Sequence, residues 1–339
     1  MKHWKQLSHA EQIAILREQR LKTHLPQSAI EKDWWVTAVL KALSMTSIAN
    51  QLIFKGGTSL SKGWGVIERF SEDIDLAIRR EGYFTLSSTS KSQRERIRKA
   101  SRRFIHETLS EELRNELHEM GIDGFEIGCV TETKDRDNIY HAIDSDKDPT
   151  VLNVRYDSVA EDKIPYMPTQ VKIEISCMSM HEPTQMIRIP SIIAQAYPKD
   201  DETVVEFSTV VPTRTFLEKI FLLNEEFAKE KPRTNRMSRH LYDLERLMDT
   251  DFGRDALKNR ELYSEIVEHR RVFYALKYFD YDKHAPSTVT IIPPEQLMHL
   301  WKDDYEEMRK SYIYGHALTF EELIARMEEL ERRIRMMQI

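Results

Sequence analysis

Two aspartates that lie two positions apart, shortly after a glycine pair, constrain this chain more than any other feature. The glycine pair stands in FKGGTSL, residues 54–60, and the aspartates stand in RFSEDIDL, residues 69–76. Because residues i and i+2 of a strand point to the same face, Asp73 and Asp75 should converge on one point while Ile74 enters the core. Two carboxylates beside a phosphate-binding turn predict a site for a divalent metal ion and a nucleoside triphosphate.

The glycine pair should form a turn that leads from a strand into a helix. Backbone N–H groups in such a turn bind phosphate, and the hydroxyl of Ser59 would add one more donor. The sequence contains no Gly-Lys-Ser or Gly-Lys-Thr, so this turn is not a P-loop. An ordinary tight turn is the alternative, since Gly56 and Gly57 alone indicate no more than that.

A third carboxylate is expected from a neighbouring strand, because a two-metal site needs one to complete the ligand set. Glu174, in the apolar run VKIEIS at 171–176, is the candidate. An acid in the middle of such a strand is costly unless it is paired or bound to metal. The alternative is an ion pair with Lys172, which lies on the same face of the strand.

Hydrophobic periodicity divides the chain near Pro212 into a mixed α/β part and a helical part. We predict a mixed α/β domain over 1–211 and a helical domain over 212–339 that completes the active cleft. Strands are expected over 52–54, 73–78, 125–130, 151–156, 171–176 and 204–211, with a long hairpin loop over 132–149. Helices are expected over 11–20, 28–43, from 58 to about 63, 90–120, 213–229, 235–249, 254–279, 294–310 and 319–337.

Composition excludes several classes of protein. No apolar run approaches the length of a membrane span, and the N-terminus lacks the apolar core of a signal peptide. Cys129 and Cys177 fall in strand-like runs and should be buried thiols in a reducing compartment, so we expect a cytoplasmic protein with no membrane contact. The net charge of −6 argues against a protein that coats nucleic acid without specificity.

A local basic run is nevertheless present between residues 91 and 103. It contains seven cations against the single acid Glu95: Lys91, Arg94, Arg96, Arg98, Lys99, Arg102 and Arg103. Positions 91, 94, 98 and 102 recur at helical spacing, so we predict that Arg94, Arg98 and Arg102 contact an RNA backbone. A solvated helix face is the alternative.

The stretches FKGGTSL at 54–60 and RFSEDIDL at 69–76 together resemble the signature of the AbiEii/AbiGii toxin family of nucleotidyltransferases. Further stretches that resemble this family are EKDWWV at 31–36, VKIEI at 171–175, RTFLEK at 214–219 and RMSRHLYDL at 236–244. The resemblance implies an α+β fold: a polymerase-beta-like nucleotidyltransferase core with a mixed sheet, followed by a C-terminal helical bundle. It also implies the toxin of a toxin–antitoxin or abortive-infection system, which moves a nucleotide from an NTP to an acceptor, as some relatives do to the 3′ end of tRNA.

The resemblance implies roles residue by residue. Mg²⁺ or Mn²⁺ would be bound by Asp73, Asp75 and Glu174, and catalysis would add Lys219 and Asp243. The nucleotide would be bound by Lys55, Gly56, Gly57, Thr58, Ser59, Ser71 and Lys219. Many polymerase-beta-like enzymes have an aspartate where Glu174 stands, so this longer side chain would lie either on the metal or just behind it.

Three of these residues could instead have purely structural roles. Lys219 would otherwise be a surface lysine paired with Glu218 or Glu225, Asp243 would pair with Arg239, and Ser71 would form a local turn. For the whole protein, the alternatives are an acceptor that is a protein or a small molecule, and a non-catalytic protein that binds NTP or the cognate antitoxin. The intact acid pair argues against the non-catalytic protein.

Overall fold

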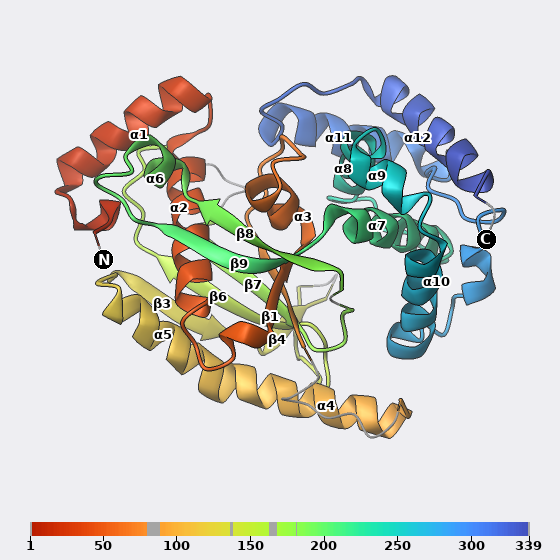
Figure 1. Cartoon of the computed structure of the whole chain (residues 1–339), viewed down its shortest axis with the longest axis horizontal. Helices are drawn as coiled ribbons and strands as arrows, with labels where there is room; N and C mark the ends of the chain where they lie inside the picture. Colours follow the sequence, from red (N-terminus) through yellow and green to blue (C-terminus); the bar gives the residue numbers. More distant parts are fainter. Residues whose placement is uncertain (1, 80–88, 136–137, 163–167, 181, 338–339) are drawn as a thin grey trace. The chain divides into compact units, whose positions relative to one another are not determined.

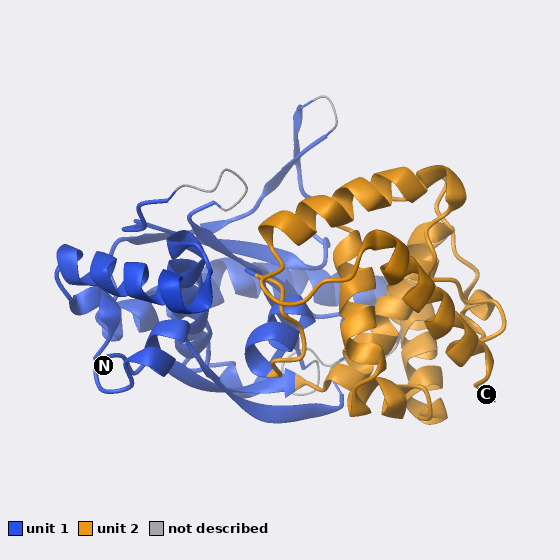
Figure 2. Cartoon of the chain, turned by 90° about the horizontal axis from the view of Figure 1, so that it is seen from above, with its two compact units in different colours: residues 1–63, 72–209 blue, residues 64–71, 210–339 orange. Residues whose placement is uncertain are grey.

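The computed structural model describes residues 2–79, 89–135, 138–162, 168–180 and 182–337 (Figure 1). It divides into two compact units, which Figure 2 shows in different colours. Unit 1 comprises Met1–Gly63 and Glu72–Thr209, and unit 2 comprises Trp64–Ser71 and Val210–Ile339. The chain therefore passes into unit 2 twice, first for the short segment that precedes the acid pair. The division expected after residue 211 does not assign Trp64–Ser71 to the helical part.

Unit 1 is built on a mixed sheet, which confirms the predicted fold class. Among the described residues the strand order is β3-β6-β7-β2-β1-β9-β8. The central pairs β2–β7 and β1–β9 are parallel, whereas β1–β2, β6–β7 and β3–β6 are antiparallel. The strands are β1 (Leu52–Lys55), β2 (Ile74–Ile78), β3 (Phe125–Cys129), β6 (Thr150–Tyr156), β7 (Gln170–Ser176), β8 (Thr184–Pro190) and β9 (Val204–Val210).

Most of these strands match their predicted ranges, but β8 was missed. It lies at the edge of the sheet, and its residues Gln185, Met186 and Arg188 are exposed. An edge strand tolerates polar side chains and a terminal proline, so it lacks the apolar alternation that reveals central strands. The predicted loop over 132–149 contains a small separate hairpin, β4 (Glu132–Lys134) and β5 (Tyr140–Ala142), while 136–137 lie outside the described residues.

The helices of unit 1 largely follow the prediction. They are α1 (His9–Thr23), α2 (Gln27–Leu43), α3 (Gly56–Thr58), α4 (Lys91–Phe104), α5 (Ser110–Glu119) and α6 (Ile192–Ala196). A π-helical turn over Ser59–Gly63 continues α3, and another over Ile105–Leu109 joins α4 to α5. Short 3₁₀ turns form at Trp4–Gln6 and Ala49–Gln51. The short helix α6 was not predicted.

Helix α2 is buried along almost its whole length and organises the core of unit 1. Trp34 and Trp35 are both fully buried, with their rings edge to face, and Trp35 stacks on Tyr156 of β6. The indole N–H of Trp34 donates to the carboxylate of Asp201 at 2.8 Å. That carboxylate also accepts from the backbone N–H groups of Trp4 and Thr203, so it ties the N-terminus and α2 to the approach to β9.

Unit 2 is helical, as predicted. Its helices are α7 (Pro212–Phe227), α8 (Ser238–Met248), α9 (Asp251–Ala256), α10 (Arg260–His269), α11 (Met298–Ser311) and α12 (Phe320–Arg335). A π-helical turn follows α10 at Arg270–Tyr274, and 3₁₀ turns form at Tyr281–His284 and Glu295–Leu297. No helix in the described part of the chain is long and apolar enough to cross a membrane.

The prediction of one helix over 254–279 was wrong. Helix α9 ends at Ala256, and Asn259 begins α10 by accepting a hydrogen bond from the backbone N–H of Leu262. Asparagine competes for backbone partners in this way and so favours a helix cap over a helix interior. The π-helical turn after α10 then ends at Ala275, whose φ of 47° is left-handed.

We expect Asp201→Ala to lower the free energy of unfolding by about 3 kcal/mol, because three buried N–H groups lose a charged acceptor. Urea denaturation of the full chain measures this change. Asp200→Ala is the matched control, since Asp200 is an exposed neighbour paired with Lys2 and should cost under about 1 kcal/mol. Equal losses in the two variants would mean that the Asp201 contacts do not hold the core together.

Candidate functional site

The turn after β1 packs directly against the second aspartate. Strands β1 and β2 are antiparallel, with Lys55 opposite Asp75. Gly56 follows with a left-handed φ of 77°, and a Cβ placed there would lie 2.1 Å from the Asp75 carboxylate oxygen Oδ2. Only glycine satisfies both demands, so the strand pairing brings the predicted phosphate-binding turn and the predicted metal ligand into contact.

The hydroxyl groups of the turn stabilise its backbone. Thr58 and Ser59 are fully buried. The Thr58 hydroxyl donates to the backbone carbonyl of Asp73, and the Ser59 hydroxyl donates to the carbonyl of Gly56 at 2.9 Å. The turn is therefore tied to the backbone of the acid pair on the next strand. Ile74 and Leu76 are fully buried while Asp75 is partly exposed, which confirms the predicted alternation.

Two buried residues of α2, which the sequence reasoning did not single out, support this arrangement. Lys32 donates to Glu72 at 2.6 Å, and both side chains are almost fully buried. Asp33 accepts from Lys62, at the end of the π-helical turn that follows the glycine pair, and from the backbone N–H of Ile192. Helix α2 thus anchors residues on both sides of the site. The signal in the sequence was that Lys32 and Asp33 directly precede the tryptophan pair in a mostly apolar helix.

Strand β7 brings Glu174 beside Asp75. The parallel register of β2 and β7 places Asp75 directly opposite Glu174. Glu174 is also ion-paired with Lys172, which is the alternative that the sequence offered for this acid. Burial alone would lower the pKa of Lys172, but the hydrogen bond to Glu174 and the charges of Glu174, Asp73 and Asp75 raise it above its usual value. Lys172 therefore experiences the field of all three carboxylates.

The three acids supply the hard oxygen donors that Mg²⁺ prefers. Among the residues that the structure describes, however, no three or more His, Cys, Asp and Glu side chains are grouped so as to hold a metal ion. Glu174 is engaged by Lys172. The donor chemistry therefore fits a divalent cation at Asp73 and Asp75, and Glu174 would have to exchange Lys172 for the ion to become a third ligand.

In unit 2, Asp243 of α8 lies at the centre of a buried charge cluster. Arg69 forms a bidentate pair with it, with Nε 2.7 Å from Oδ1 and Nη2 2.8 Å from Oδ2. The ammonium of Lys219, on α7, lies 2.8 Å from Oδ2 and 3.4 Å from Nδ1 of His240. The Lys219 side chain is only 9% exposed, so it is not a surface lysine.

The titration of this cluster is strongly perturbed. Burial lowers the pKa of Lys219, and burial together with the Lys219 charge holds the pKa of His240 well below its usual value. Burial alone would raise the pKa of Asp243, but Arg69 and Lys219 outweigh it and lower that pKa. These shifts keep the imidazole of His240 neutral and the carboxylate of Asp243 charged at neutral pH, with Arg69 and Lys219 both in contact with that carboxylate. Sequence reasoning missed Arg69, although it stands only four residues before Asp73.

The basic run on α4 is exposed on a different face from the one predicted. Arg102 is buried and donates to the carbonyl of Val130, while Arg94 and Arg98 are only partly exposed. These positions flank the stripe that packs inward, on which Ile97, Ser101 and Ile105 are buried. The exposed cations are Lys91, Arg96, Lys99 and Arg103. The predicted row 91, 94, 98 and 102 is therefore wrong as a description of the exposed face.

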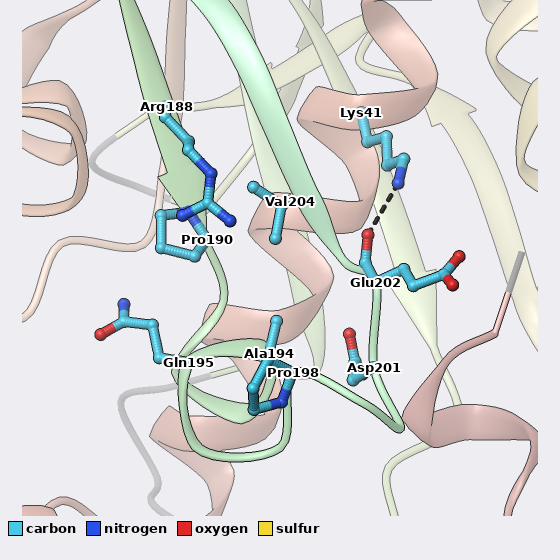
Figure 3. Close-up of a pocket in the computed structure, with 9 residues that line it drawn as sticks. All are labelled: Lys41, Arg188, Pro190, Ala194, Gln195, Pro198, Asp201, Glu202 and Val204. Carbon is cyan, nitrogen blue, oxygen red and sulfur yellow. Dashed lines mark hydrogen bonds between the residues drawn. The ribbon is translucent and has the colours of Figure 1, made fainter.

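A separate pocket of about 710 Å³ lies in unit 1 among α2, α6, β8 and the start of β9 (Figure 3). None of the predicted site residues lines it. Its cations Lys41 and Arg188 are balanced by Asp201 and Glu202, and the Lys41 ammonium already donates to the backbone carbonyl of Glu202 at 2.7 Å. With no net charge in its lining, this pocket does not resemble a triphosphate site.

The sequence matches a protein family described as the nucleotidyl transferase AbiEii toxin of type IV toxin–antitoxin systems, over residues 38–326. Among solved structures, the fold is similar to MenT4, a nucleotidyltransferase toxin from Mycobacterium tuberculosis H37Rv. That similarity has a TM-score of 0.47 at 16% identity and covers 98% of this chain and 100% of that chain. No curated protein sequence matches. Since the family match spans most of its length, this chain belongs to the AbiEii family of nucleotidyltransferase toxins.

Proposed function

We propose that this nucleotidyltransferase toxin uses Mg²⁺, or Mn²⁺ in its place, to transfer a nucleotide from an NTP to the 3′ end of a tRNA. The observation that carries the proposal is the contact between the Gly56 turn and the Asp75 carboxylate, because it joins a phosphate-binding backbone to a metal-binding side chain. We further propose that the protein acts in the cytoplasm and is controlled by a cognate antitoxin.

In this proposal Asp73 and Asp75 hold the divalent ion, which supplies charge neutralisation for the triphosphate when it is bound. The residues at 55–59 form the backbone turn that holds the phosphates, and the buried hydroxyls of Thr58 and Ser59 keep that turn in shape. The contribution of the protein is mostly positioning and electrostatics, as is usual for nucleotidyl and phosphoryl transfer.

Lys219 is proposed to bind the triphosphate through its ammonium group. An ammonium has three N–H donors, and the contacts with Asp243 and His240 account for two of them. Lys219 is almost fully buried, so a charge–phosphate contact there would be much stronger than at an exposed lysine. Asp243 holds Lys219 in place, which makes it a positioning residue in this proposal.

The RNA acceptor is proposed to contact the exposed face of α4. Arg96, Lys99 and Arg103 recur at helical spacing, are exposed, and have no ion-pair partner among the described residues. A row of unpaired cations on an otherwise acidic protein is suited to a phosphate backbone.

Incubation of the protein with labelled NTPs, Mg²⁺ and total RNA tests the reaction. We expect label on RNA of tRNA size, and none with Asp75→Asn, because an amide at this position removes the charge that holds the ion. Parallel reactions without RNA identify other acceptors. Label on the protein itself would mean that the acceptor is the protein and not tRNA. No label in any reaction would contradict the proposed activity.

We expect Gly56→Ala to abolish nucleotide transfer, because the new methyl group would collide with the Asp75 carboxylate. Gly65→Ala is the matched control. Gly65 also has a positive φ, of 63°, but apart from its chain neighbours no atom of the described residues lies within 4 Å of a Cβ placed there. The control should lose about 1 kcal/mol of stability from backbone strain and keep its activity. Equal effects on transfer in the two variants would show that strain, not the contact with Asp75, sets the requirement for glycine.

The triple variant Arg96→Ala, Lys99→Ala and Arg103→Ala should weaken tRNA binding. The slope of log affinity against log salt should fall by roughly 0.7–0.9 for each phosphate that the protein no longer neutralises, as measured by filter binding across a salt series. A second triple variant, Lys258→Ala, Arg260→Ala and Lys277→Ala, removes the same charge from exposed positions of unit 2. If this second variant weakens binding and the first does not, the acceptor docks on the helical unit instead.

A further inference from the structure

We propose that Arg69 is a positioning residue for nucleotide transfer: it shares the carboxylate of Asp243, so that the Lys219 ammonium keeps net positive charge for the triphosphate. This inference rests on the proposed role of Lys219. Arg69 is not one of the residues to which the proposed function gives a role, which are those of the glycine turn, the acid pair, Lys219 and Asp243.

The geometry around Asp243 carries the argument. Its side chain is fully buried, and Arg69 occupies both carboxylate oxygens in a fork of 2.7 and 2.8 Å. Lys219 adds a third contact, at 2.8 Å. A carboxylate engaged in this way is not available as a metal ligand or a general base. Asp243 must therefore act through the cations that it contacts.

The balance of charge explains why two cations are present. If Asp243 were paired with Lys219 alone, one negative and one positive charge would cancel, and the ammonium would attract a phosphate only weakly. With Arg69 on the same carboxylate, the pair of cations exceeds the anion by one, and a buried site screens this excess poorly. His240 adds no charge because its pKa is held well below its usual value by burial and by the Lys219 charge.

The same arrangement affects the titration of Lys219. Burial is the largest influence and lowers its pKa, Asp243 raises it, and Arg69 and Arg239 lower it further. Loss of the Arg69 charge should therefore raise the pKa of Lys219. Arg270 is not among the charges that shift the pKa of Lys219, so Arg270→Gln should leave that pKa in place.

A second buried pair in unit 2 offers a matched control. Arg270 contacts Glu225 in the same forked geometry, and Glu225 has a further partner, His284, at 3.1 Å. Arg69→Gln and Arg270→Gln therefore both remove a buried guanidinium and both leave the carboxylate with one remaining partner. The two variants should lose comparable stability in thermal unfolding, since breaking a buried pair is costly in either place.

The experiment measures the binding of inorganic tripolyphosphate in the presence of Mg²⁺ by calorimetry, and the pH dependence of kcat/KM for NTP. We expect Arg69→Gln to weaken tripolyphosphate binding about tenfold, to raise KM more than it lowers kcat, and to move the alkaline limb to higher pH. Arg270→Gln should leave all three properties unchanged. Arg69→Lys keeps the charge with a single contact, so it should restore part of the affinity even if Arg69→Gln does not fold.

Lys219→Ala distinguishes failure of this inference from failure of the proposed function. If Lys219→Ala loses tripolyphosphate binding while the folded Arg69 variants retain it, Arg69 serves only the fold and the inference is wrong. If Lys219→Ala binds tripolyphosphate as tightly as the native protein does, Lys219 does not hold the triphosphate and its proposed role is wrong.

Discussion

The antiparallel pairing of β1 with β2 is the constraint on which the candidate site in unit 1 depends. This pairing sets Lys55 opposite Asp75 and brings the next residue, Gly56, against the Asp75 carboxylate. A slip of one residue in this register would turn both aspartates toward the core and the neighbouring apolar residues outward. The complete burial of Ile74 and Leu76 opposes such a slip, so the hydrophobic effect holds the acid pair in place.

Buried charge is organised differently in the two units. In unit 1, Lys172 lies in the field of Asp73, Asp75 and Glu174, so the acids exceed the cation there. In unit 2, Arg69 and Lys219 share the single carboxylate of Asp243, so the cations exceed the acid. An excess of acid favours a divalent metal ion and an excess of cations favours a phosphate, so the two charge clusters favour ligands of opposite charge.

Much of the fold could be predicted because local patterns were strong. The alternation around Asp75 predicted a strand, and the spacing of apolar residues predicted α2, α7 and α8 near their observed limits. The misses follow from weak local signals. Strand β8 is a polar edge strand, and the break at Asn259 depends on one capping side chain within an otherwise helical pattern. On α4, helical spacing identified a basic run, but it could not tell which face packs inward.

The sequence by itself determined the chemistry of this protein: a glycine turn, an acid pair and a family signature that identify a nucleotidyltransferase toxin. Those features are local, because they depend on backbone freedom and on side-chain alternation within a few residues. Only the tertiary structure decided the partners: Glu174 beside Asp75, Lys172 on Glu174, and Arg69 on Asp243. Glu174 and Asp75, and likewise Arg69 and Asp243, are far apart in the sequence, so local patterns could not pair them. The burial that makes an ion pair such as Arg69–Asp243 strong arises only when the chain packs around it.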